Sequence, residues 1–231
     1  MEIKILQLLE GARQAEGLAV IIDVLRAFTV ACHVIENGAE KIIAVKDVEA
    51  AFLLKEEHPG YVLIGERYEA IVPGFDFGNH PSHIAPVDFT GKTAVLTTSA
   101  GTLGLVHAAD RADEVITGSF VNAGAIIRYI RERQPDVVSL VCMGYSADYE
   151  VEEDTFCAEY IKNALENRTS DFEEMVRIVR ETSGRRFFDP ATMHHSLPED
   201  FEMCMRLDIF DFVLKATREG GGGLALFRET V

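Results

Sequence analysis

Carboxylates, arginines and a hydroxyl-rich turn recur directly after short apolar runs of this sequence. They are Asp23, Arg26, Glu66, Arg67 and a turn at 97–102 that contains Ser99, Gly101 and Thr102. Carboxylate oxygens are the ligands that Mg²⁺ and Ca²⁺ prefer, and arginine forks pair with phosphate or sulfonate oxygens. Free backbone N–H groups at the start of a helix attract a tetrahedral anion. These residue types predict a metal-assisted site for a small anion.

Two further segments can supply groups that bind the substrate. Gly118 and Ser119 follow another apolar run, and a loop at 73–81, rich in glycine and proline, carries Asp76 and Asn79. Asp and Asn side chains in such a loop also form turns with their own backbone, so a purely structural role is the alternative.

An acidic stretch at 150–154 precedes a helix and brings carboxylates close to a thiol. Asp154 and Glu153 precede Cys157 by one helical turn, which places the three side chains on one helix face. The helix dipole also favours acidic residues in a first turn, so a capping role is the alternative interpretation.

The polar residues after the other runs have structural alternatives as well. Asp23 is a common N-cap type, Glu66 and Arg67 would suit a solvated surface pair, and the turn at 97–102 would suit cap chemistry. The functional interpretation gains support because such residues recur at the same end of successive runs.

Short apolar runs alternate with longer helical stretches along most of the chain. We expect strands at 18–22, 42–45, 61–64, 93–96, 114–117 and 137–142, and helices at 28–37, 48–57, 103–109, 121–133 and 154–167. This alternation is typical of parallel strands joined by crossover helices, and it predicts a three-layer α/β/α fold with a mostly parallel sheet. Ligands bind such sheets beyond the carboxyl ends of the strands, where the polar residues described above lie.

The alternation ends near residue 170. Amphipathic helical stretches at 171–182 and 198–206 surround a loop at 184–190, which predicts a helical C-terminal subregion at about 170–206.

The last part of the chain leads back to the sheet. It does so through 207–214, continues through a glycine run at 220–223 that predicts a hairpin or loop, and ends in a strand at 224–227. No linker marks a boundary, so we expect a single α/β domain over 1–231.

The composition is that of an acidic globular chain. Its 231 residues include 22 Lys and Arg against 38 Asp and Glu, a net charge of −16, and 48% hydrophobic residues. This charge repels phosphate backbones and anionic lipid, so we expect no nucleic-acid and no membrane partner. No apolar run is long enough to span a membrane and the N-terminus lacks a signal-peptide pattern, so we expect a cytoplasmic protein.

Several common catalytic motifs are absent from the sequence. It has no G-x-x-x-x-G-K-[ST] loop and no G-x-S-x-G elbow. Leu25 stands where an aspartyl phosphatase needs a second aspartate after Asp23, and Cys142 lacks the C-x5-R spacing of a cysteine phosphatase. The cysteines are widely spaced, which indicates reduced thiols, and the pair His194 and His195 lacks metal-ligand spacing.

Six ordered segments resemble the motifs of the 2-phosphosulfolactate phosphatase family. They are VIIDVLRA at 20–27, GER at 65–67, GFDFGNHP at 74–81, TTSAGT at 97–102, GSFVN at 118–122 and EDTFCA at 153–158. The resemblance covers most of the chain and includes its end at 208–213. It implies an α/β/α fold and a Mg²⁺-dependent phosphatase that hydrolyses (R)-2-phospho-3-sulfolactate to 3-sulfolactate and phosphate, a step of coenzyme M biosynthesis in methanogens.

This chain departs from the family pattern at three places. Ala100 replaces the usual Asn before the glycine of the Thr-rich turn, His80 replaces a Ser, and the glycine-rich segment after Cys142 is reduced to Met-Gly-Tyr-Ser-Ala. Another small phosphomonoester is therefore an alternative substrate. A non-catalytic anion-binding module, or a member that has lost its activity, is an alternative function.

We assign hypothetical roles to the candidate residues. Asp23, Glu66 and Asp154 or Glu153 would hold Mg²⁺, while Arg26, Arg67 and the turn at 99–102 would hold the phosphoryl oxygens. The expected substrate-binding residues are Asp76, Asn79, Ser99, Gly101, Thr102, Gly118 and Ser119.

The nucleophile and the partner of the substrate's second anionic group are open. Metal-bound water is the favoured nucleophile, with Ser99 and Cys157 as side-chain alternatives and a packing role favoured for Cys157. Arg186 is a candidate for the sulfonate or carboxylate, although a surface role is the favoured interpretation. The composition also allows a homodimer.

Overall fold

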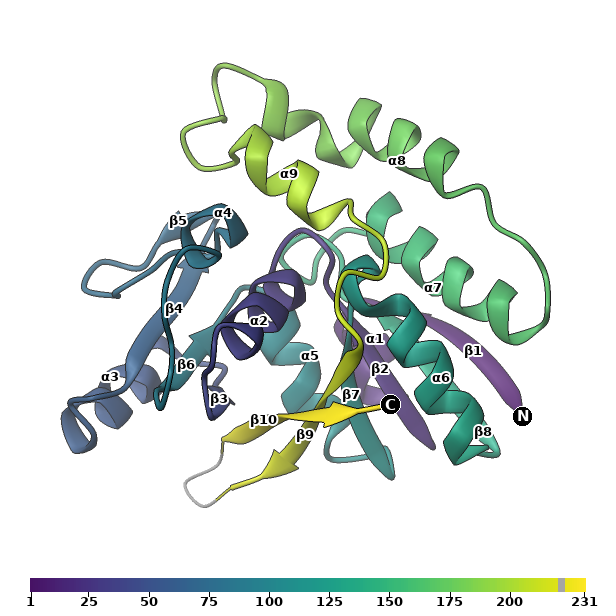
Figure 1. The fold of residues 1–231 in the computed structure, drawn as a ribbon, viewed down its shortest axis with the longest axis horizontal. Coiled ribbons are helices and arrows are strands. Elements are labelled where there is room, and N and C mark those ends of the chain that lie inside the picture. Colours follow the sequence, from purple (N-terminus) through teal and green to yellow (C-terminus); the bar gives the residue numbers. More distant parts are fainter. Residues whose placement is uncertain (220–222) are drawn as a thin grey trace.

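The strands form one ten-stranded sheet in the computed structural model, which describes residues 1–219 and 223–231 (Figure 1). They are β1 (Glu2–Gln7), β2 (Leu18–Ile22), β3 (Lys41–Ala44), β4 (Val62–Arg67), β5 (Ala70–Ile71), β6 (Thr93–Thr97), β7 (Glu114–Gly118), β8 (Val137–Cys142), β9 (Phe212–Arg218) and β10 (Leu224–Thr230). Their order across the sheet is β1-β8-β2-β7-β9-β10-β3-β6-β4-β5.

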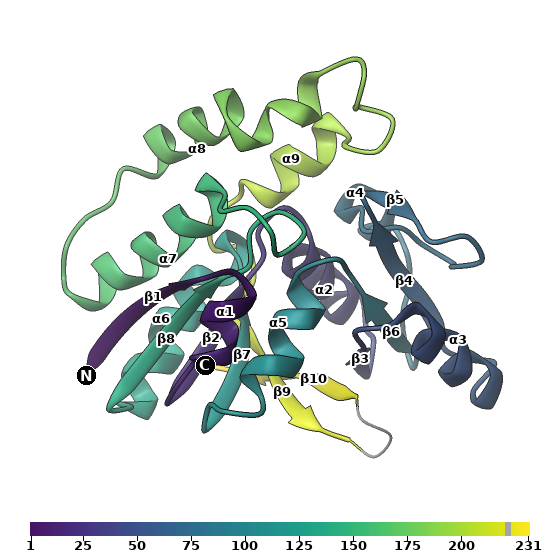
Figure 2. The same cartoon turned by 180° about the vertical axis from the view of Figure 1, so that it is seen from behind.

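Helices cover both faces of this sheet. They are α1 (Leu8–Arg13), α2 (Ala27–Glu36), α3 (Val48–Glu57), α4 (Pro81–Ile84), α5 (Gly101–Ala108), α6 (Ala123–Arg133), α7 (Glu152–Leu165), α8 (Phe172–Glu181) and α9 (Pro198–Cys204), with 3-10 turns η1 (Phe120–Asn122) and η2 (Ser183–Phe188). Figure 2 shows α1 and α5 on the face opposite to α6 and α7.

The side chains of β2 show why both faces are apolar. Ala19 and Ile21 pack with α1, α2 and α5, whereas Val20 and Ile22 pack with α6 and α7 on the other face. Successive side chains of a strand point to opposite faces, so a strand buried on both sides must be apolar throughout. The predicted three-layer α/β/α fold is confirmed.

An antiparallel hairpin of β9 and β10 lies between two parallel groups of strands. β1, β8, β2 and β7 form one parallel group, and β3, β6 and β4 form the other. In a flat sheet this hairpin would make the two groups run in opposite directions, because it reverses the strand direction at each pairing. Residues beyond β2, β6 and β8 nevertheless line one pocket, so the sheet twists strongly across the hairpin.

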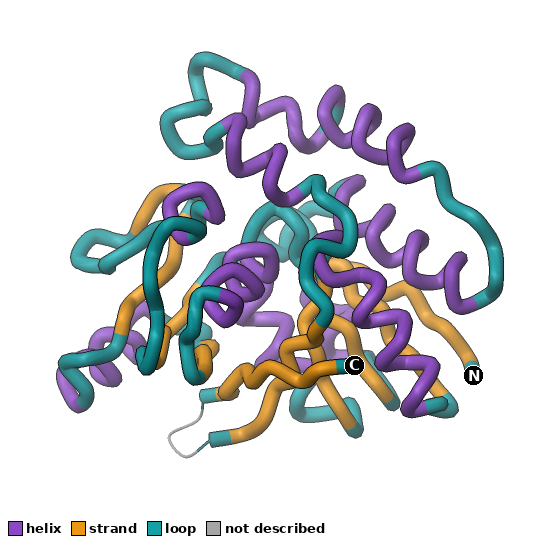
Figure 3. The backbone as a smooth tube through the Cα atoms, in the orientation of Figure 1, coloured by secondary structure: helices purple, strands orange, loops and turns teal. Residues whose placement is uncertain are grey.

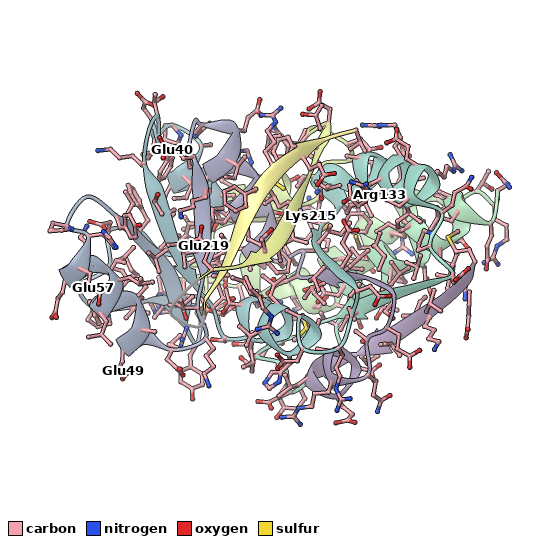
Figure 4. All side chains as sticks on the ribbon, turned by 90° about the horizontal axis from the view of Figure 1, so that it is seen from below. Glu40, Glu49, Glu57, Arg133, Lys215 and Glu219 are labelled. Atoms are coloured by element: carbon pink, nitrogen blue, oxygen red, sulfur yellow. The ribbon has the colours of Figure 1, made fainter. Side chains whose placement is uncertain are left out.

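Ion pairs attach the hairpin to its neighbours. Lys215 of β9 lies 3.0 Å from Glu114 of β7, and Lys41 of β3 lies 2.7 Å from Glu219. Arg133 of α6 contacts Glu229 of β10. Figure 4 shows Arg133, Lys215 and Glu219 along this side of the molecule.

The helical C-terminal subregion is confirmed as α8, η2 and α9. It lies above the carboxyl ends of the strands, where α8 packs on α7 and α9 packs on α4 (Figures 1 and 3). Within the described residues, no helix combines the length and the apolar character needed to cross a membrane.

Two elements at the N-terminus were not expected from the sequence, β1 and α1. β1 is an edge strand that pairs only with β8 among the described strands, and its side chains are half-buried or exposed. Polar residues interrupt its sequence, so it lacks the continuous apolar run that indicates a central strand. The final strand is confirmed and extends to Thr230, whereas residues 220–222 of the predicted glycine hairpin or loop lie outside the described residues.

Candidate active site

A pocket lies at the carboxyl ends of the parallel strands. It is partly open to solvent, and most of the side chains that line it are charged or polar. Its walls come from the loops after β2, β4, β6 and β8, from the first turn of α7 and from η2. The lining residues are Asp23, Leu25, Arg26, Glu66, Glu69, Asn79, Ser99, Ala100, Gly144, Tyr145, Ser146, Glu153, Asp154 and Arg186.

The predicted carboxylates converge on this pocket. Asp23 follows β2, Glu66 belongs to β4, and Glu153 and Asp154 belong to the first turn of α7. All four residues are buried, with exposed fractions between 2% and 8%. Buried carboxylates without a matching number of cations repel one another, so the pocket favours a bound cation.

Asp23 and Asp154 are held by backbone donors. Asp154 accepts hydrogen bonds from Val24 N–H at 2.9 Å and Gly144 N–H at 2.8 Å, and Asp23 accepts one from Ala27 N–H at 3.1 Å. Burial, followed by repulsion from Asp23 and Glu153, raises the pKa of Asp154 well above its ordinary value. Burial and the charge of Glu66 raise the pKa of Asp23 to about 6.

Glu66 accepts hydrogen bonds from the turn that follows β6 and from its own hairpin. Its Oε1 accepts from Ser99 N–H at 2.7 Å, and its Oε2 accepts from Ser99 Oγ–H at 3.0 Å and Glu69 N–H at 2.9 Å. These bonds fix Glu66 and Ser99 against each other at the pocket wall. The turn at 97–102 thus reaches the pocket through Ser99, as the sequence predicted.

Two arginines supply the positive charge of the pocket. Arg26 is 3% exposed, and Arg186 donates from Nε to Glu69 at 2.7 Å. The ring of Phe187 lies close to both guanidinium groups, with its centroid 5.5 Å from Arg26 and 4.9 Å from Arg186. The favoured assignment of Arg186 to the surface is wrong, because its side chain is only 17% exposed and lines the pocket.

Arg67 lies outside this pocket, contrary to its predicted role as a phosphoryl clamp. Its Nη2 donates to Thr97 Oγ at 2.8 Å and to the carbonyl of Lys46 at 3.0 Å. It lines a neighbouring pocket together with Lys46. Alternation along β4 is the reason, since Glu66 and Arg67 point to opposite sides of the strand.

Asp76 and Thr102 do not reach the pocket either, although both were predicted to bind substrate. Asp76 is 42% exposed and accepts hydrogen bonds from Leu63 N–H at 2.8 Å and Lys55 at 3.2 Å. Thr102 is fully buried, and its hydroxyl donates to the Thr98 carbonyl at 3.1 Å. Both residues stabilise turns, which is the structural alternative stated above.

Gly118 and Ser119 are likewise structural rather than exposed to the pocket. A side chain at Gly118 would meet Val20 and Ile22, and Ser119 Oγ lies 2.8 Å from Thr29 Oγ in the interior. Gly118 ends β7 and Ser119 follows it, and neither residue lines the pocket.

Gly101 leaves room for a pocket carboxylate, whereas Asn79 lines the pocket itself. Gly101 leaves room for Asp23, because a Cβ atom there would lie 2.8 Å from Asp23 Oδ2. Asn79 lines the pocket and is 5% exposed, and its Oδ1 has no hydrogen-bond partner among the described residues. Asn79 therefore remains a candidate for binding substrate.

The two side-chain nucleophile candidates lie in different environments. Cys157 belongs to α7 and is fully buried in the core, and burial raises the pKa of its thiol well above the ordinary value. Ser99 lines the pocket with its hydroxyl donated to Glu66. The packing role favoured for Cys157 agrees with this placement.

The chemistry of the pocket suits Mg²⁺. All four predicted ligands offer carboxylate oxygens to one pocket, although no three His, Cys, Asp or Glu side chains of residues 1–219 and 223–231 already stand in metal-binding geometry. Mg²⁺ retains several waters and needs only one or two direct carboxylate ligands. The residues present therefore fit a magnesium ion held partly through water.

Sequence reasoning missed several residues around the pocket. Glu69, Tyr145 and Ser146 lie in tight turns whose sequences carry no chemical motif. Asp200 of α9 is fully buried and pairs with Arg26 at 2.9 Å. It follows Pro198 and Glu199 in a first helical turn, where an acid is ordinary, so no sequence signal marked it.

Comparison with known proteins points to one family. Residues 3–219 match the family model described as 2-phosphosulpholactate phosphatase. A Bacillus subtilis protein is 32% identical over 205 residues, covering 87% of each chain, and a Carboxydothermus hydrogenoformans protein is 32% identical over 223 residues, covering 92% of each chain. A Caldicellulosiruptor saccharolyticus protein is 33% identical over 215 residues, covering 86% of this chain and 88% of that relative. Each relative is named a probable 2-phosphosulfolactate phosphatase.

Proposed function

The chain belongs to the 2-phosphosulfolactate phosphatase family, and from this premise we propose that it hydrolyses (R)-2-phospho-3-sulfolactate to 3-sulfolactate and phosphate with the help of Mg²⁺. It is a phosphoric monoester hydrolase by this membership. The observation that carries the proposal is one pocket lined by five carboxylates and two arginines. A metal ion and a polyanionic ester would together balance these charges.

Asp23, Glu66, Glu153 and Asp154 would hold the metal ion. Bound Mg²⁺ would neutralise negative charge on the phosphoryl oxygens. The hydrogen bonds from Val24, Gly144 and Ala27 orient two of these carboxylates in advance, so little side-chain freedom is lost when the site fills.

Arg26 would bind the phosphoryl oxygens. Its guanidinium group lines the pocket from the β2 side. In phosphoryl transfer the protein mainly positions the reactants and stabilises charge spread over the equatorial oxygens. A fixed arginine supplies both functions.

Arg186 would bind the second anionic group of the substrate. It lies close to the ring of Phe187, as Arg26 does, and its Nε donates a hydrogen bond to Glu69. A sulfonate or carboxylate can replace Glu69 as the partner of this guanidinium group. A phosphomonoester without a second anion would leave that interaction unused.

Water is the proposed nucleophile. A pocket carboxylate that does not contact the metal ion directly would accept its proton. Ser99 is the side-chain alternative. Its hydroxyl donates a hydrogen bond to Glu66, which leaves the lone pairs of Ser99 Oγ available for attack.

A different small phosphomonoester is the second candidate substrate. Ala100, which departs from the family pattern, lines the pocket itself. A smaller side chain there removes a polar group, so the shape and polarity of the substrate subsite differ from those of the family pattern.

The test is an assay of phosphate release from metal-stripped protein. The protein is treated with EDTA and assayed with phosphosulfolactate and a panel of small phosphomonoesters, with and without added Mg²⁺. Release from phosphosulfolactate that returns with Mg²⁺ supports the proposal. Release from another ester alone would move the proposal to that substrate, and no release from any ester would refute it.

A further inference from the structure

Arg26 is held from one side only. Its Nη1 donates to Asp200 Oδ2 at 2.9 Å and to the His195 carbonyl at 2.9 Å, and lies 2.9 Å from His80 Nδ1. Its Nη2 and Nε have no hydrogen-bond partner in the described part of the chain. Neither atom is closed off from solvent. These donors therefore face the open space of the pocket.

The partner that holds Arg26 is itself completely fixed. Asp200 is 0% exposed. Its Oδ2 accepts from Arg26 and lies 2.6 Å from His80 Nδ1, and its Oδ1 accepts from Ser82 N–H at 3.0 Å and Ser82 Oγ–H at 2.6 Å. Because a carboxylate only accepts, the proton of the short contact with His80 belongs to the imidazole.

This network joins three separate parts of the fold. Arg26 precedes α2, Ser82 belongs to α4, and Asp200 belongs to the first turn of α9. Burial raises the pKa of Asp200, but hydrogen bonds from His80 and Ser82 and the charge of Arg26 bring it below the ordinary value. Asp200 is thus a charged anchor outside the substrate pocket.

Several carboxylates near Arg26 could form an ion pair with it in place of Asp200. Five carboxylates line the same pocket, yet Asp200 is the one carboxylate paired with Arg26 within the described ranges. Without Asp200, a buried guanidinium group would lack a counterion and would turn toward one of the pocket carboxylates. That rotation would block both the anion-binding donors and a metal ligand.

We propose that Asp200, supported by Ser82, is a positioning residue that keeps Arg26 directed at the phosphoryl group and away from the pocket carboxylates. The proposal rests on the proposed function of Arg26 as a phosphoryl-binding residue. It gives the helical C-terminal subregion a role in the reaction, because α9 supplies the anchor.

If the role of Asp200 were purely electrostatic, its neutralisation would change anion binding in the opposite direction. If Asp200 only weakens the positive field of Arg26, then its neutralisation makes the pocket bind anions more tightly. If Asp200 positions Arg26, its neutralisation makes anion binding weaker despite the loss of a negative charge.

The experiment measures binding of inorganic phosphate by calorimetry in buffer with Mg²⁺. Asp200→Asn should weaken phosphate binding by at least about fivefold relative to the unaltered protein. In an Arg26→Gln background the same substitution should change binding by less than about twofold, because the group through which Asp200 acts is gone. Tighter binding by Asp200→Asn, or equal weakening in both backgrounds, overturns the proposal.

Two further variants complete the design. Glu199→Gln removes an acid from the same helical turn that lies outside this network, and it should leave phosphate binding unchanged. If Asp200→Asn does not fold, Ser82→Ala tests the same idea, since it removes one of the donors that fix Asp200 and should also weaken phosphate binding. Tighter binding by Ser82→Ala would refute the proposal.

The failure of this inference and of the proposed function can be told apart. Phosphate binding is measured without turnover, so it reports on Arg26 even if no phosphoester is hydrolysed. Turnover by a protein whose Asp200→Asn variant binds phosphate more tightly would keep the function and refute the positioning role.

Discussion

Asp23 carries a charge that its surroundings oppose. Its carboxylate accepts a hydrogen bond from the first residue of α2, so it does act partly as the cap that its position in the sequence allowed. An uncharged Asn caps a helix equally well, however, and would avoid the repulsion from Glu66. A charge retained against this cost is characteristic of a functional group.

Substitution of Asp23 by Asn should therefore increase stability and abolish activity together. The folded-state pKa of about 6 exceeds the ordinary value of 3.8, so the folded protein binds this proton more tightly than the unfolded chain. Stability from this residue is complete below the unfolded pKa and is lost as pH rises through the folded pKa. The variant should then be more stable than the unaltered protein by roughly 2–3 kcal/mol at pH 8 without metal.

Urea unfolding at pH 8 and near pH 4 measures this difference. Near pH 4 the gain should largely disappear, because the folded protein is then protonated at Asp23 and the unfolded chain is protonated in part. The same variant should lower kcat by roughly a hundredfold or more. A variant that is less stable at pH 8, or that retains normal kcat, contradicts the assignment.

The turn between β8 and α7 connects backbone geometry to the site. Gly144 adopts φ +68°, and its N–H donates to Asp154 at 2.8 Å. A Cβ atom there would lie 2.1 Å from the Tyr149 carbonyl. Only glycine can combine this backbone conformation, this close approach and the hydrogen bond to the carboxylate.

Gly144→Ala should destabilise the fold and weaken the site. The left-handed backbone and the steric clash together should cost about 2–5 kcal/mol in unfolding free energy. Gly91→Ala is a matched control, because Gly91 also has φ +68° but a Cβ atom added there would have no neighbour within 4 Å. That control should lose only about 1–2 kcal/mol. Equal losses in urea unfolding would show that the contact with Tyr149 is unimportant.

The elements that the sequence predicted are those buried on both faces. The strands at 18–22 and 137–142 are continuous apolar runs in the sequence and are central strands in the sheet. β1 was missed because its single strand partner leaves it half-exposed, and α4 because four residues give no helical period.

The candidate site was predictable where chemistry follows a strand directly. Asp23, Glu66 and Ser99 lie in the pocket because the carboxyl ends of β2, β4 and β6 meet there. Arg67 and Ser119 were predicted by the same rule and lie elsewhere, since one residue of shift along a strand reverses the side on which a side chain points. The role of Asp200 could not be predicted from the sequence, because its partner Arg26 lies far away in the sequence and only the fold brings the two residues together.

The pocket also joins the two parallel groups of strands. Asp23 belongs to the group that contains β2, and Glu66 belongs to the group that contains β4. A cation shared by carboxylates of both groups would link them across the twisted sheet. Ligand binding to the folded state alone stabilises the whole molecule.

Removal of Mg²⁺ should therefore lower the thermal stability of the entire fold. Mg²⁺ at about a hundred times its Kd should add about 2.7 kcal/mol, which corresponds to roughly 5–10 °C in Tm for a chain of this size. Differential scanning calorimetry with Mg²⁺, and with EDTA at matched ionic strength, measures this shift. Asp154→Asn should reduce the shift, whereas Asp76→Asn, which alters an exposed carboxylate outside the pocket, should retain it. An equal shift in both variants would place the cation elsewhere.

The position of β9 and β10 has a consequence for protein synthesis. These strands come from the last part of the chain, yet they occupy the middle of the sheet between β7 and β3. While the ribosome is still making residues 212–230, the two parallel groups have no strand to join them and each exposes an apolar edge. The sheet can close only when residues 212–230 have left the ribosome, so we expect nascent chains of this protein to depend on chaperone protection until these two strands have emerged.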